Sequence, residues 1–255
     1  NVSYGLKMAK VKKNEYIEKS IETLKLVNLE GYENRMPSEL SGGQQQRVAV
    51  ARAIVLEPKV LLFDEPLSNL DAKLRRQVRE DIRNIQQRLG VTTIYVTHDQ
   101  EESLAISDNV IVMNKSIIAQ EGKPIDLYDN PNTKFVANFI GDANIIKAEA
   151  TSKNATLHTL KIGEVIVEVN STKKINKTTS IALRPEKINI NKNKKENNLI
   201  GKIISASFVG NSYQYTISTN VGKIYVISHD TINNFELNSE VFLSFEKNDI
   251  KILDD

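Results

Sequence analysis

Two adjacent carboxylates, Asp64 and Glu65, directly follow the apolar run Val-Leu-Leu-Phe at residues 60–63. Such a run is typical of a β-strand that is covered on both faces. Acidic side chains at the carboxyl end of a parallel strand face the crevice in which these sheets bind ligands. The first carboxylate suits Mg²⁺, which keeps most of its water shell and takes one or two carboxylates. The second can extend beyond the metal and accept a proton from an attacking water.

We therefore expect Asp64 to hold the metal ion and Glu65 to act as the general base. For an isolated Asp-Glu pair the simpler interpretation is a strand end that caps the next turn. The segments before and after this strand, described next, favour the chemical interpretation.

The segment Ser41-Gly42-Gly43 is a candidate phosphate cradle. Two glycines let backbone N–H groups approach an anion closely, and the beginning of a helix adds partial positive charge. Ser41 followed three residues later by Gln44 is a capping box, which predicts that a helix begins at this point. A Gly-Gly loop ahead of a helix is common, so this interpretation depends on the full string, which continues to Arg47.

His98 follows a β-branched run at residues 92–97 and precedes Asp99. A histidine at the end of a strand is more often a structural hydrogen-bonding group than a catalytic one. Here it stands opposite the end of the acidic strand, from which it could reach a phosphate and orient the water held by Glu65. His158 and His229 have no comparable context, and no role is assigned to them.

The elements that must position these residues alternate between helix and strand. Alternation of this kind predicts a parallel sheet within an α/β layer. Asp71 is the expected N-cap of the helix after the acidic strand, and Gly90 is its expected C′ residue. The expected helices cover residues 14–29, 43–57, 71–89, 100–107, 124–129 and 133–140, and the expected strands cover 60–65, 92–97, 109–113 and 117–120. In the first helix Ile17, Ile21 and Leu24 share one face.

The pattern changes near Gly141, where helical spacing fades and β-rich runs begin. These runs are divided by Asn, Lys and Gly and predict a small all-β, barrel-like domain. Residues 191–198 contain no apolar side chain and are interpreted as a solvated loop. The β-rich runs include residues 165–169, 180–183, 213–217, 223–227 and 241–245.

Composition sets outer limits on the function. The 255 residues carry a net charge of +2, which alone favours neither a nucleic-acid nor a membrane-surface partner. There are no cysteines, which excludes disulfides and thiolate metal sites. No P-loop motif, G-x-x-x-x-G-K-S/T, is present, because no Gly-Lys pair is followed by Ser or Thr. Since the first residue is Asn1, we expect a C-terminal portion of a longer protein.

Taken together, the motifs resemble those of the ATP-binding-cassette (ABC) transporter ATPases. Residues 40–44 look like the family's signature motif, 60–65 like its Walker B strand and 68–71 like its D-loop. Thr97-His98-Asp99 looks like the switch-histidine loop. The resemblance implies an α/β P-loop NTPase cassette, here its C-terminal part with the helical subdomain, followed by a small all-β oligomer-binding-type regulatory domain. It implies ATP and Mg²⁺ as cofactors.

The resemblance also implies a head-to-tail dimer, in which each nucleotide lies between one subunit's P-loop and the other subunit's signature. By that carry-over, Ser41, Gly42, Gly43 and Gln44 would bind the nucleotide of a neighbouring subunit, and Asp71 would support contact across the dimer. Residues 1–36 would form much of the helical subdomain, whose surface receives a membrane permease. The expected location is the cytoplasmic face of the cell membrane, with an extracytoplasmic solute-binding protein as an indirect partner.

Two further segments, 138–144 and 183–186 (Leu-Arg-Pro-Glu), resemble the junction and regulatory domain of importers for ferric iron, polyamines, sugars and phosphoesters. The likeness is nearest to the ferric-iron branch, with the polyamine branch next. The expected domains are 1–140 for the cassette and 141–255 for the β-rich regulatory domain. Ser116 departs from the family, in which Gly usually occupies that turn, so a slightly strained hairpin is expected.

Two other function classes remain open at this stage. A nucleic-acid-associated ABC ATPase usually carries long coiled coils or two cassettes, and neither is seen here, so no nucleic-acid partner is expected. A non-catalytic module that lends its signature or its barrel to an intact partner agrees with the missing P-loop. On that ground we expect no ATP turnover by these 255 residues alone, and an ATP-hydrolysing importer subunit as the function of the intact protein.

Overall fold

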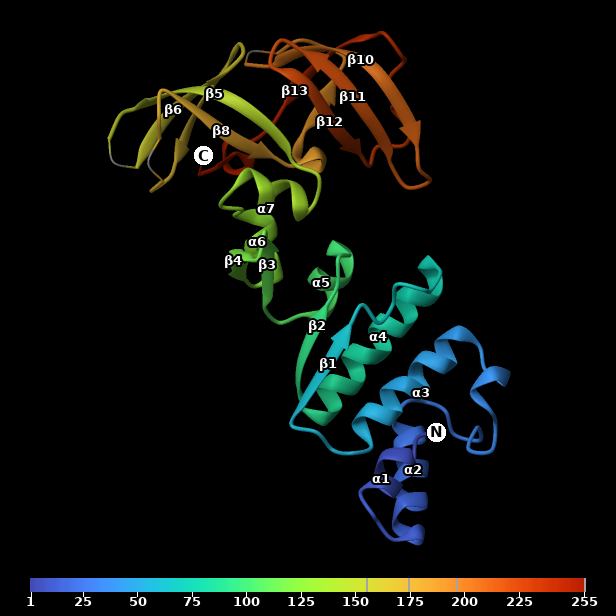
Figure 1. Cartoon of the computed structure of the whole chain (residues 1–255). Coiled ribbons are helices and arrows are strands. Elements are labelled where there is room, and N and C mark those ends of the chain that lie inside the picture. Colours follow the sequence, from blue (N-terminus) through green and yellow to red (C-terminus); the bar gives the residue numbers. More distant parts are fainter. Residues whose placement is uncertain (155, 174, 196, 255) are drawn as a thin grey trace. The chain divides into compact units, whose positions relative to one another are not determined.

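The computed structural model describes residues 1–154, 156–173, 175–195 and 197–254 (Figure 1). The chain divides into two compact units, Asn1–Asp108 and Asn109–Asp255, and each is described by itself.

The first unit is an α/β arrangement whose core is formed by buried aliphatic side chains from helices and strands alike. Its helices and strands follow the alternating order that the sequence predicts, preceded by one short additional helix. Its elements are α1 (Tyr4–Met8), α2 (Lys13–Leu26), the 3₁₀ helix η1 (Pro37–Glu39), α3 (Gly42–Ile54), β1 (Val60–Asp64), α4 (Ala72–Leu89), β2 (Thr92–Val96) and α5 (Gln100–Ile106).

Strands β1 and β2 pair in parallel, from Val60 opposite Thr92 to Asp64 opposite Val96, as predicted. Alternate residues point to opposite faces of a strand. On one face Leu61 and Phe63 join the core that α3 and α4 help to form. On the other face the apolar side chains are largely exposed, namely Val60 at 47%, Leu62 at 74%, Ile94 at 55% and Val96 at 51%.

The prediction that both strands are buried on both faces is therefore wrong for this unit. An apolar run shows that a strand suits two covering layers. It does not show that the same stretch of chain supplies both layers. Here the helices of the unit pack against one face only.

The predicted helix at 14–29 exists but is shorter, ending at Leu26. Of the three side chains expected on its apolar face, Leu24 is buried whereas Ile17 is 41% exposed. The buried side of the helix instead includes Ser20 and Thr23, whose hydroxyls donate to backbone carbonyls four residues earlier. A satisfied hydroxyl can be buried at little cost, which is why the apolar pattern alone misplaced this face.

The predicted signals at the ends of α3 and α4 are confirmed. Ser41 is the N-cap of α3 and forms the capping box with Gln44. Asp71 is the N-cap of α4, and Gly90 follows the helix with a left-handed φ of 61°. Left-handed backbone is accessible to Gly without a steric cost, so Gly90 ends α4 where the sequence predicts.

The second unit is rich in β-structure and also contains two short helices. Its elements are β3 (Val110–Asn114), β4 (Ile117–Gly122), α6 (Pro124–Asp129), α7 (Lys134–Phe139), β5 (Asn144–Ser152), β6 (Leu157–Ile162), β7 (Val165–Asn170), β8 (Thr178–Leu183), η2 (Pro185–Lys187), β9 (Asn189–Asn191), β10 (Leu199–Phe208), β11 (Tyr213–Thr219), β12 (Gly222–Ser228), β13 (Glu240–Ser244), η3 (Lys247–Asp249) and β14 (Lys251–Ile252).

Two five-stranded sheets dominate this unit, with strand orders β12-β11-β10-β13-β9 and β14-β8-β5-β6-β7 (Figure 1). Side chains from both sheets share one buried core that includes Leu160, Ile181, Ile203 and Tyr215. All five predicted β-rich runs are strands. The strands β5, β6, β9, β10 and β14 lie outside these five runs.

In the segment 191–198, the residues that the structure describes lack regular structure beyond the end of β9, but they are not simply solvated. Asn198 is 6% exposed and donates to the Leu243 carbonyl. The side chain of Asn197 bonds both the amide and the carbonyl of Ile166. Residue 196 lies outside the described residues.

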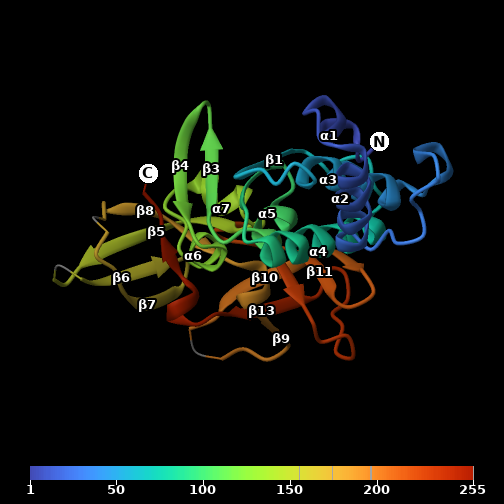
Figure 2. The ribbon, with the colours of Figure 1, turned by 90° about the horizontal axis from the view of Figure 1, so that it is seen from below.

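Strands β3 and β4 form an antiparallel hairpin, whose two strands run side by side in Figure 2. The two turn residues, Lys115 and Ser116, have φ angles of 50° and 64°. Two consecutive positive φ values are the mark of the hairpin turn that favours Asn and Gly. The expected strain at Ser116 therefore has a structural basis.

The compact units divide at Asp108/Asn109, whereas the β-rich sheets begin at β5, close to the predicted boundary at residues 140/141. The segment between these positions contains the β3–β4 hairpin, α6 and α7. The division into functional domains at 140/141 stays a prediction.

Candidate nucleotide-hydrolysis site

Glu65 is held at a sharp turn where β1 ends. Its amide donates to the Val96 carbonyl at 2.9 Å, and its own carbonyl accepts from the Ser68 hydroxyl at 3.1 Å. Its φ of 43° lies in the left-handed region, which costs a non-glycine residue free energy. The turn projects the carboxylate away from the strand, where the side chain is 48% exposed.

His98 lies directly against Glu65, with His98 Nδ1 at 3.0 Å from Glu65 Oε1. The hydrogen bond to the Glu65 carboxylate and its negative charge raise the pKa of His98 above its ordinary value. An ionised carboxylate can only accept, so the imidazole donates its Nδ1–H. The structure thus brings together the two residues predicted to be catalytic, 33 positions apart in the chain.

Asp64 is the last residue of β1 and is exposed. Within the part of the chain that the structure describes, no hydrogen bond or ion pair engages its carboxylate, which is therefore available to a ligand. Mg²⁺ needs only one or two carboxylates because water fills its remaining positions. The described residues contain no cluster of three or more acidic, His or Cys side chains that could enclose a metal ion. A single exposed carboxylate at the strand end fits a hydrated Mg²⁺ and not an enclosed metal site.

The N-terminus of α3 is closed by its own side chains. The Ser41 amide donates to Gln44 Oε1 at 3.0 Å, and the Gln44 amide donates to Ser41 Oγ at 3.4 Å. The Gln44 side chain is thereby committed to the cap. The anion-binding capacity of this segment consequently comes from the backbone N–H groups of the first helical turn and from the Ser41 hydroxyl.

The two glycines of this segment lie against the beginning of α4. A Cβ added to Gly43 would come within 2.6 Å of Leu74 Cδ1, and one added to Gly42 would lie 3.5 Å from Leu70 Cδ2. Asp71 stands between those leucines and accepts from the Leu74 amide at 2.9 Å. The structure therefore places Asp71 next to the candidate phosphate cradle, within one unit.

Three residues that the sequence patterns did not single out, Glu102, Tyr95 and Arg75, surround the His98 loop. Glu102 is 3% exposed and accepts from Tyr95 Oη at 3.1 Å and Thr97 Oγ1 at 2.9 Å. Burial together with the nearby Glu102 charge strongly raises the pKa of Tyr95. Arg75 contacts Asp99 at 3.1 Å. A buried glutamate in the first turn of a short helix looks like an ordinary helix-end acid in sequence, so no signal distinguished it.

Arg184, part of the Leu-Arg-Pro-Glu segment, has a structural role in the second unit. It is 7% exposed and donates to the backbone carbonyls of Tyr128, Ala137 and Gly141. Its guanidinium also lies 4.0 Å from the centre of the Tyr128 ring, and the Tyr128 hydroxyl donates to Glu186 Oε1 at 2.5 Å. This segment thus fastens α6 and α7 to the β-sheet.

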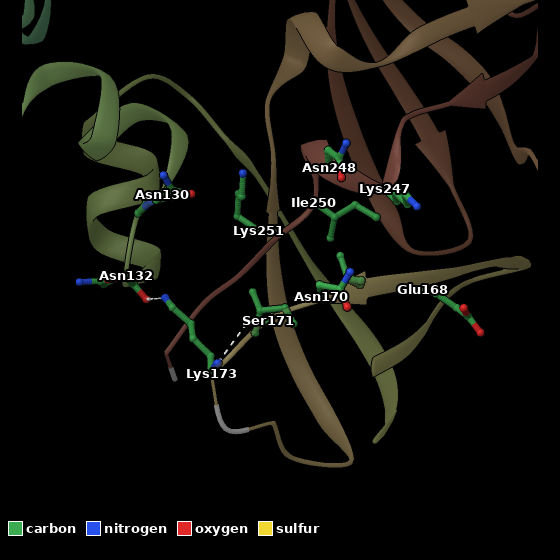
Figure 3. Close-up of a pocket in the computed structure, with 13 residues that line it drawn as sticks. Asn130, Asn132, Glu168, Asn170, Ser171, Lys173, Lys247, Asn248, Ile250 and Lys251 are labelled. Carbon is green, nitrogen blue, oxygen red and sulfur yellow. Dashed lines mark hydrogen bonds between the residues drawn. The ribbon is translucent and has the colours of Figure 1, made fainter. Parts of the chain in front are cut away.

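The second unit also contains a polar cleft of about 390 Å³. Figure 3 shows Lys173, Lys247 and Lys251 around it, with the carboxylate of Glu168 directed outward. Lys173 is already engaged, by the Asn132 carbonyl at 3.4 Å and by Asp254 at 3.3 Å. None of the predicted site residues lines this cleft.

Comparison with known proteins identifies the family. The model of the family described as "ABC transporter" matches residues 2–68, and that of the "TOBE domain" matches residues 181–253. The Fe(3+) ions import ATP-binding protein FbpC of Agrobacterium fabrum is 45% identical over 254 residues, covering 100% of this chain and 72% of its own length. The chain belongs to the ABC transporter ATP-binding proteins.

Two further import ATP-binding proteins are similar to nearly the whole chain. The Fe(3+) ions import ATP-binding proteins FbpC of Rhizobium etli and Brucella melitensis are 46% and 43% identical to this chain, and each match covers 99% of this chain and 71% of the relative. A solved structure, cbiO1 from Clostridium perfringens, described as part of the ABC transporter complex cbiONQ, is 33% identical. That match has a TM-score of 0.48 and covers 50% of this chain and 51% of the other.

Membership of the ABC family accounts for the two-part architecture. The residues matched by the ABC transporter model lie in the first unit, and those matched by the TOBE model lie in the second. Among the helices that the structure describes, none combines the length and the apolar character needed to span a membrane.

Proposed function

We propose that this chain is the ATP-hydrolysing subunit of an ABC importer for ferric iron. The observation that carries the chemistry is the contact between Glu65 and His98 at the end of β1. The observation that favours iron is the set of Fe(3+) import relatives, which match essentially the whole chain. The resemblance noted in the sequence gave polyamine importers as the next branch.

In the proposed reaction, the carboxylate of Glu65 accepts a proton from the water that attacks the γ-phosphate. His98 holds that carboxylate through its Nδ1–H and can orient the water and the phosphate. Asp64 would hold Mg²⁺ through water, and the ion would supply positive charge to neutralise the phosphates. Phosphoryl transfer of this kind depends mostly on positioning and charge stabilisation.

The signature segment completes a second nucleotide site in this proposal. Ser41, Gly42 and Gly43 would present backbone N–H groups and one hydroxyl to the γ-phosphate of a nucleotide held by another subunit. The capping box supports this role, because it fixes the backbone of the first turn in the conformation that binds anions. Gln44 would act through the cap, and Asp71 would support the contact between subunits in a head-to-tail homodimer.

The sequence contains no P-loop motif, so nothing among these 255 residues is assigned to hold the phosphates of the nucleotide on which Glu65 would act. For this reason we expect the 255 residues by themselves to show no ATP turnover. The same observation keeps a second candidate open, a non-catalytic module that lends its signature to another ATPase subunit. ATP hydrolysis by the chain in its transporter separates the two candidates.

The proposed partners are a second ATPase subunit, the permease subunits of the membrane and, indirectly, an extracytoplasmic solute-binding protein. The proposed location is peripheral, on the cytoplasmic face of the cell membrane. ATP binding would close the subunit dimer, and hydrolysis would reopen it, so that the permease alternates between its two states.

Transport in proteoliposomes tests the proposed substrate. The transporter that contains this chain is purified and reconstituted with its solute-binding protein, and ATP-dependent uptake of radioactive ferric iron and of spermidine is measured. We expect uptake of iron that stops in the Glu65→Gln variant and continues in a Glu101→Gln variant, which changes an exposed acid outside the site. Uptake of spermidine without iron would overturn the proposed substrate but not the ATPase function.

A further inference from the structure

Glu102 is an almost fully buried carboxylate, 3% exposed, directly behind the His98 loop. Its Oε2 accepts from two hydroxyls, those of Tyr95 and Thr97, at 3.1 and 2.9 Å. The Thr97 hydroxyl in turn accepts from the Asp99 amide at 3.0 Å. The residues on both sides of His98 are thus tied, directly or through one hydroxyl, to a single buried charge.

Arg75, on the first turns of α4, provides the opposite charge. Its Nη1 lies 3.1 Å from Asp99 Oδ2, and its Nε lies 3.8 Å from Glu102 Oε1. Its Nη2 donates to the Leu70 carbonyl at 3.2 Å. One guanidinium therefore joins the loop that bears His98 to the turn immediately before Asp71.

The turn before Asp71 is also the surface on which the signature glycines lie. Leu70 and Leu74 lie beside the two glycines: a Cβ added to Gly42 would lie 3.5 Å from Leu70 Cδ2, and one added to Gly43 would lie 2.6 Å from Leu74 Cδ1. A continuous set of contacts consequently runs from the N-terminus of α3, through the beginning of α4 and Arg75, to Asp99 and His98. All of these residues belong to one compact unit.

By contrast, His98 itself has little support. Its side chain is 74% exposed, and the contact with Glu65 is the hydrogen bond that the structure gives it. An exposed side chain keeps one orientation only if its backbone is fixed. In this loop the backbone is fixed by Thr97 and Asp99, and these depend on Glu102 and Arg75.

We infer that Arg75 and Glu102 are positioning residues that hold His98 against Glu65. They also fix the position of the His98 loop relative to the turn before Asp71 and to the signature segment 40–44. This inference deepens the proposed function and rests on His98 acting at the nucleotide. In a head-to-tail dimer, the signature serves a neighbour's nucleotide while His98 serves the chain's own. The Arg75 guanidinium thereby links the two half-sites of one subunit.

The test needs no nucleotide. The chain has three histidines, so the imidazole nitrogen resonances of His98 can be assigned by NMR with a His98→Gln variant. Amide hydrogen exchange is followed at the same time in residues 97–103 and, as a reference, in the buried middle of α4. The variants are Arg75→Ala, Arg75→Lys, Glu102→Ala and Glu102→Gln.

Arg83→Ala is the matched control. Arg83 lies on the same helix and pairs bidentately with Asp108, and its side chain is 26% exposed against 33% for Arg75. Among the residues that the structure describes, Arg83 makes no hydrogen bond or ion pair with the His98 loop. Loss of this ion pair should leave the His98 resonances and the exchange of 97–103 unchanged.

In Arg75→Ala and Glu102→Ala we expect the His98 Nδ1 resonance to lose the chemical shift of a hydrogen-bonded nitrogen. Amide exchange in residues 97–103 should rise about tenfold or more, because hydrogen bonds to charged groups are the stronger kind. The reference amides of α4 should stay protected. Arg75→Lys should fail to restore the hydrogen-bonded chemical shift of His98 Nδ1, since an ammonium cannot contact two sites at once as the planar guanidinium does. Glu102→Gln, which keeps an acceptor for the two hydroxyls, should leave the His98 Nδ1 chemical shift nearly unchanged.

An unchanged His98 Nδ1 chemical shift in Arg75→Ala would overturn the inference, as would a uniform rise in amide exchange over the whole first unit. If Glu102→Ala does not fold, Thr97→Val, which removes the hydroxyl that joins Glu102 to the Asp99 amide with less loss of packing, is read in the same way. These outcomes are independent of the proposed function, which fails separately if Glu65→Gln leaves ATP hydrolysis unchanged.

Discussion

At the scale of single residues, the account depends on an exposed carboxylate that is kept in one place. Glu65 is turned out of β1 by a left-handed backbone and meets His98 at 3.0 Å. Sequence patterns predicted both residues, and Asp64, because strand-end acids and a strand-end histidine have recognisable positions. They could not predict Arg75 or Glu102, whose importance comes from burial and from contacts 24 or more positions apart, as between Arg75 and Asp99.

The first prediction concerns the protonation of His98. Glu65 raises the pKa of His98 above 6.5 in the folded chain, so this pair stabilises the fold below about pH 6.5, and its contribution is lost as the pH rises through the raised pKa. In Glu65→Gln the pKa of His98 should fall back toward 6.5. An NMR titration measures it, with Glu80→Gln as a control at an exposed acid. An unshifted pKa in Glu65→Gln would show that the contact is absent in solution.

At the scale of elements, the sequence predicted the helix ends, which depend on local signals, but not the burial of strands, which depends on tertiary packing. The Ser41–Gln44 capping box, the Asp71 cap and Gly90 each fixed a helix end because they act within one turn of the chain. The burial of β1 and β2 was mispredicted because it depends on what packs on the second face. Strand β10, which lies outside the five runs read from the sequence, pairs with β11 and β13.

The β3–β4 turn gives the second prediction. A non-glycine residue in left-handed backbone costs about 1–2 kcal/mol, whereas Gly adds about 0.5–1 kcal/mol of chain entropy to the unfolded state. Since Ser116 has a φ of 64°, Ser116→Gly should raise the free energy of unfolding by about 0.5–1 kcal/mol. Thermal unfolding measures this, with β-branched Ser116→Val expected to shift the transition the other way.

The third prediction concerns the attachment of α6 and α7. Arg184→Met keeps an apolar stem but removes the donor to the carbonyls of Tyr128 and Ala137. The bond to Ala137 is buried, and an unsatisfied buried acceptor costs about 1–3 kcal/mol, so we expect a loss of about 1–3 kcal/mol. Urea unfolding followed by circular dichroism measures it. Lys187→Met, at an exposed position three residues away, serves as the control, and equal stability of the two variants would contradict this role.

At the scale of the whole molecule, the sequence predicted an α/β cassette portion followed by a β-rich domain, and the family matches agree with that order. Composition alone could not do this, because a net charge of +2 and the absence of cysteine suit many soluble classes. The order of short motifs carried the prediction. Where one functional domain ends was harder to predict, since the hairpin and the helices α6 and α7 separate the two compositional regimes.

The central claim, that this chain provides the general base of an ATP-hydrolysing importer subunit, is tested most directly by the rate of ATP hydrolysis in Glu65→Gln. The rate is measured in the purified transporter at saturating ATP, with Glu101→Gln as the control. We predict a fall of roughly 10²–10⁴-fold, with nucleotide retained in a closed dimer. Turnover equal to that of the unchanged chain would contradict the assignment of Glu65 as the base.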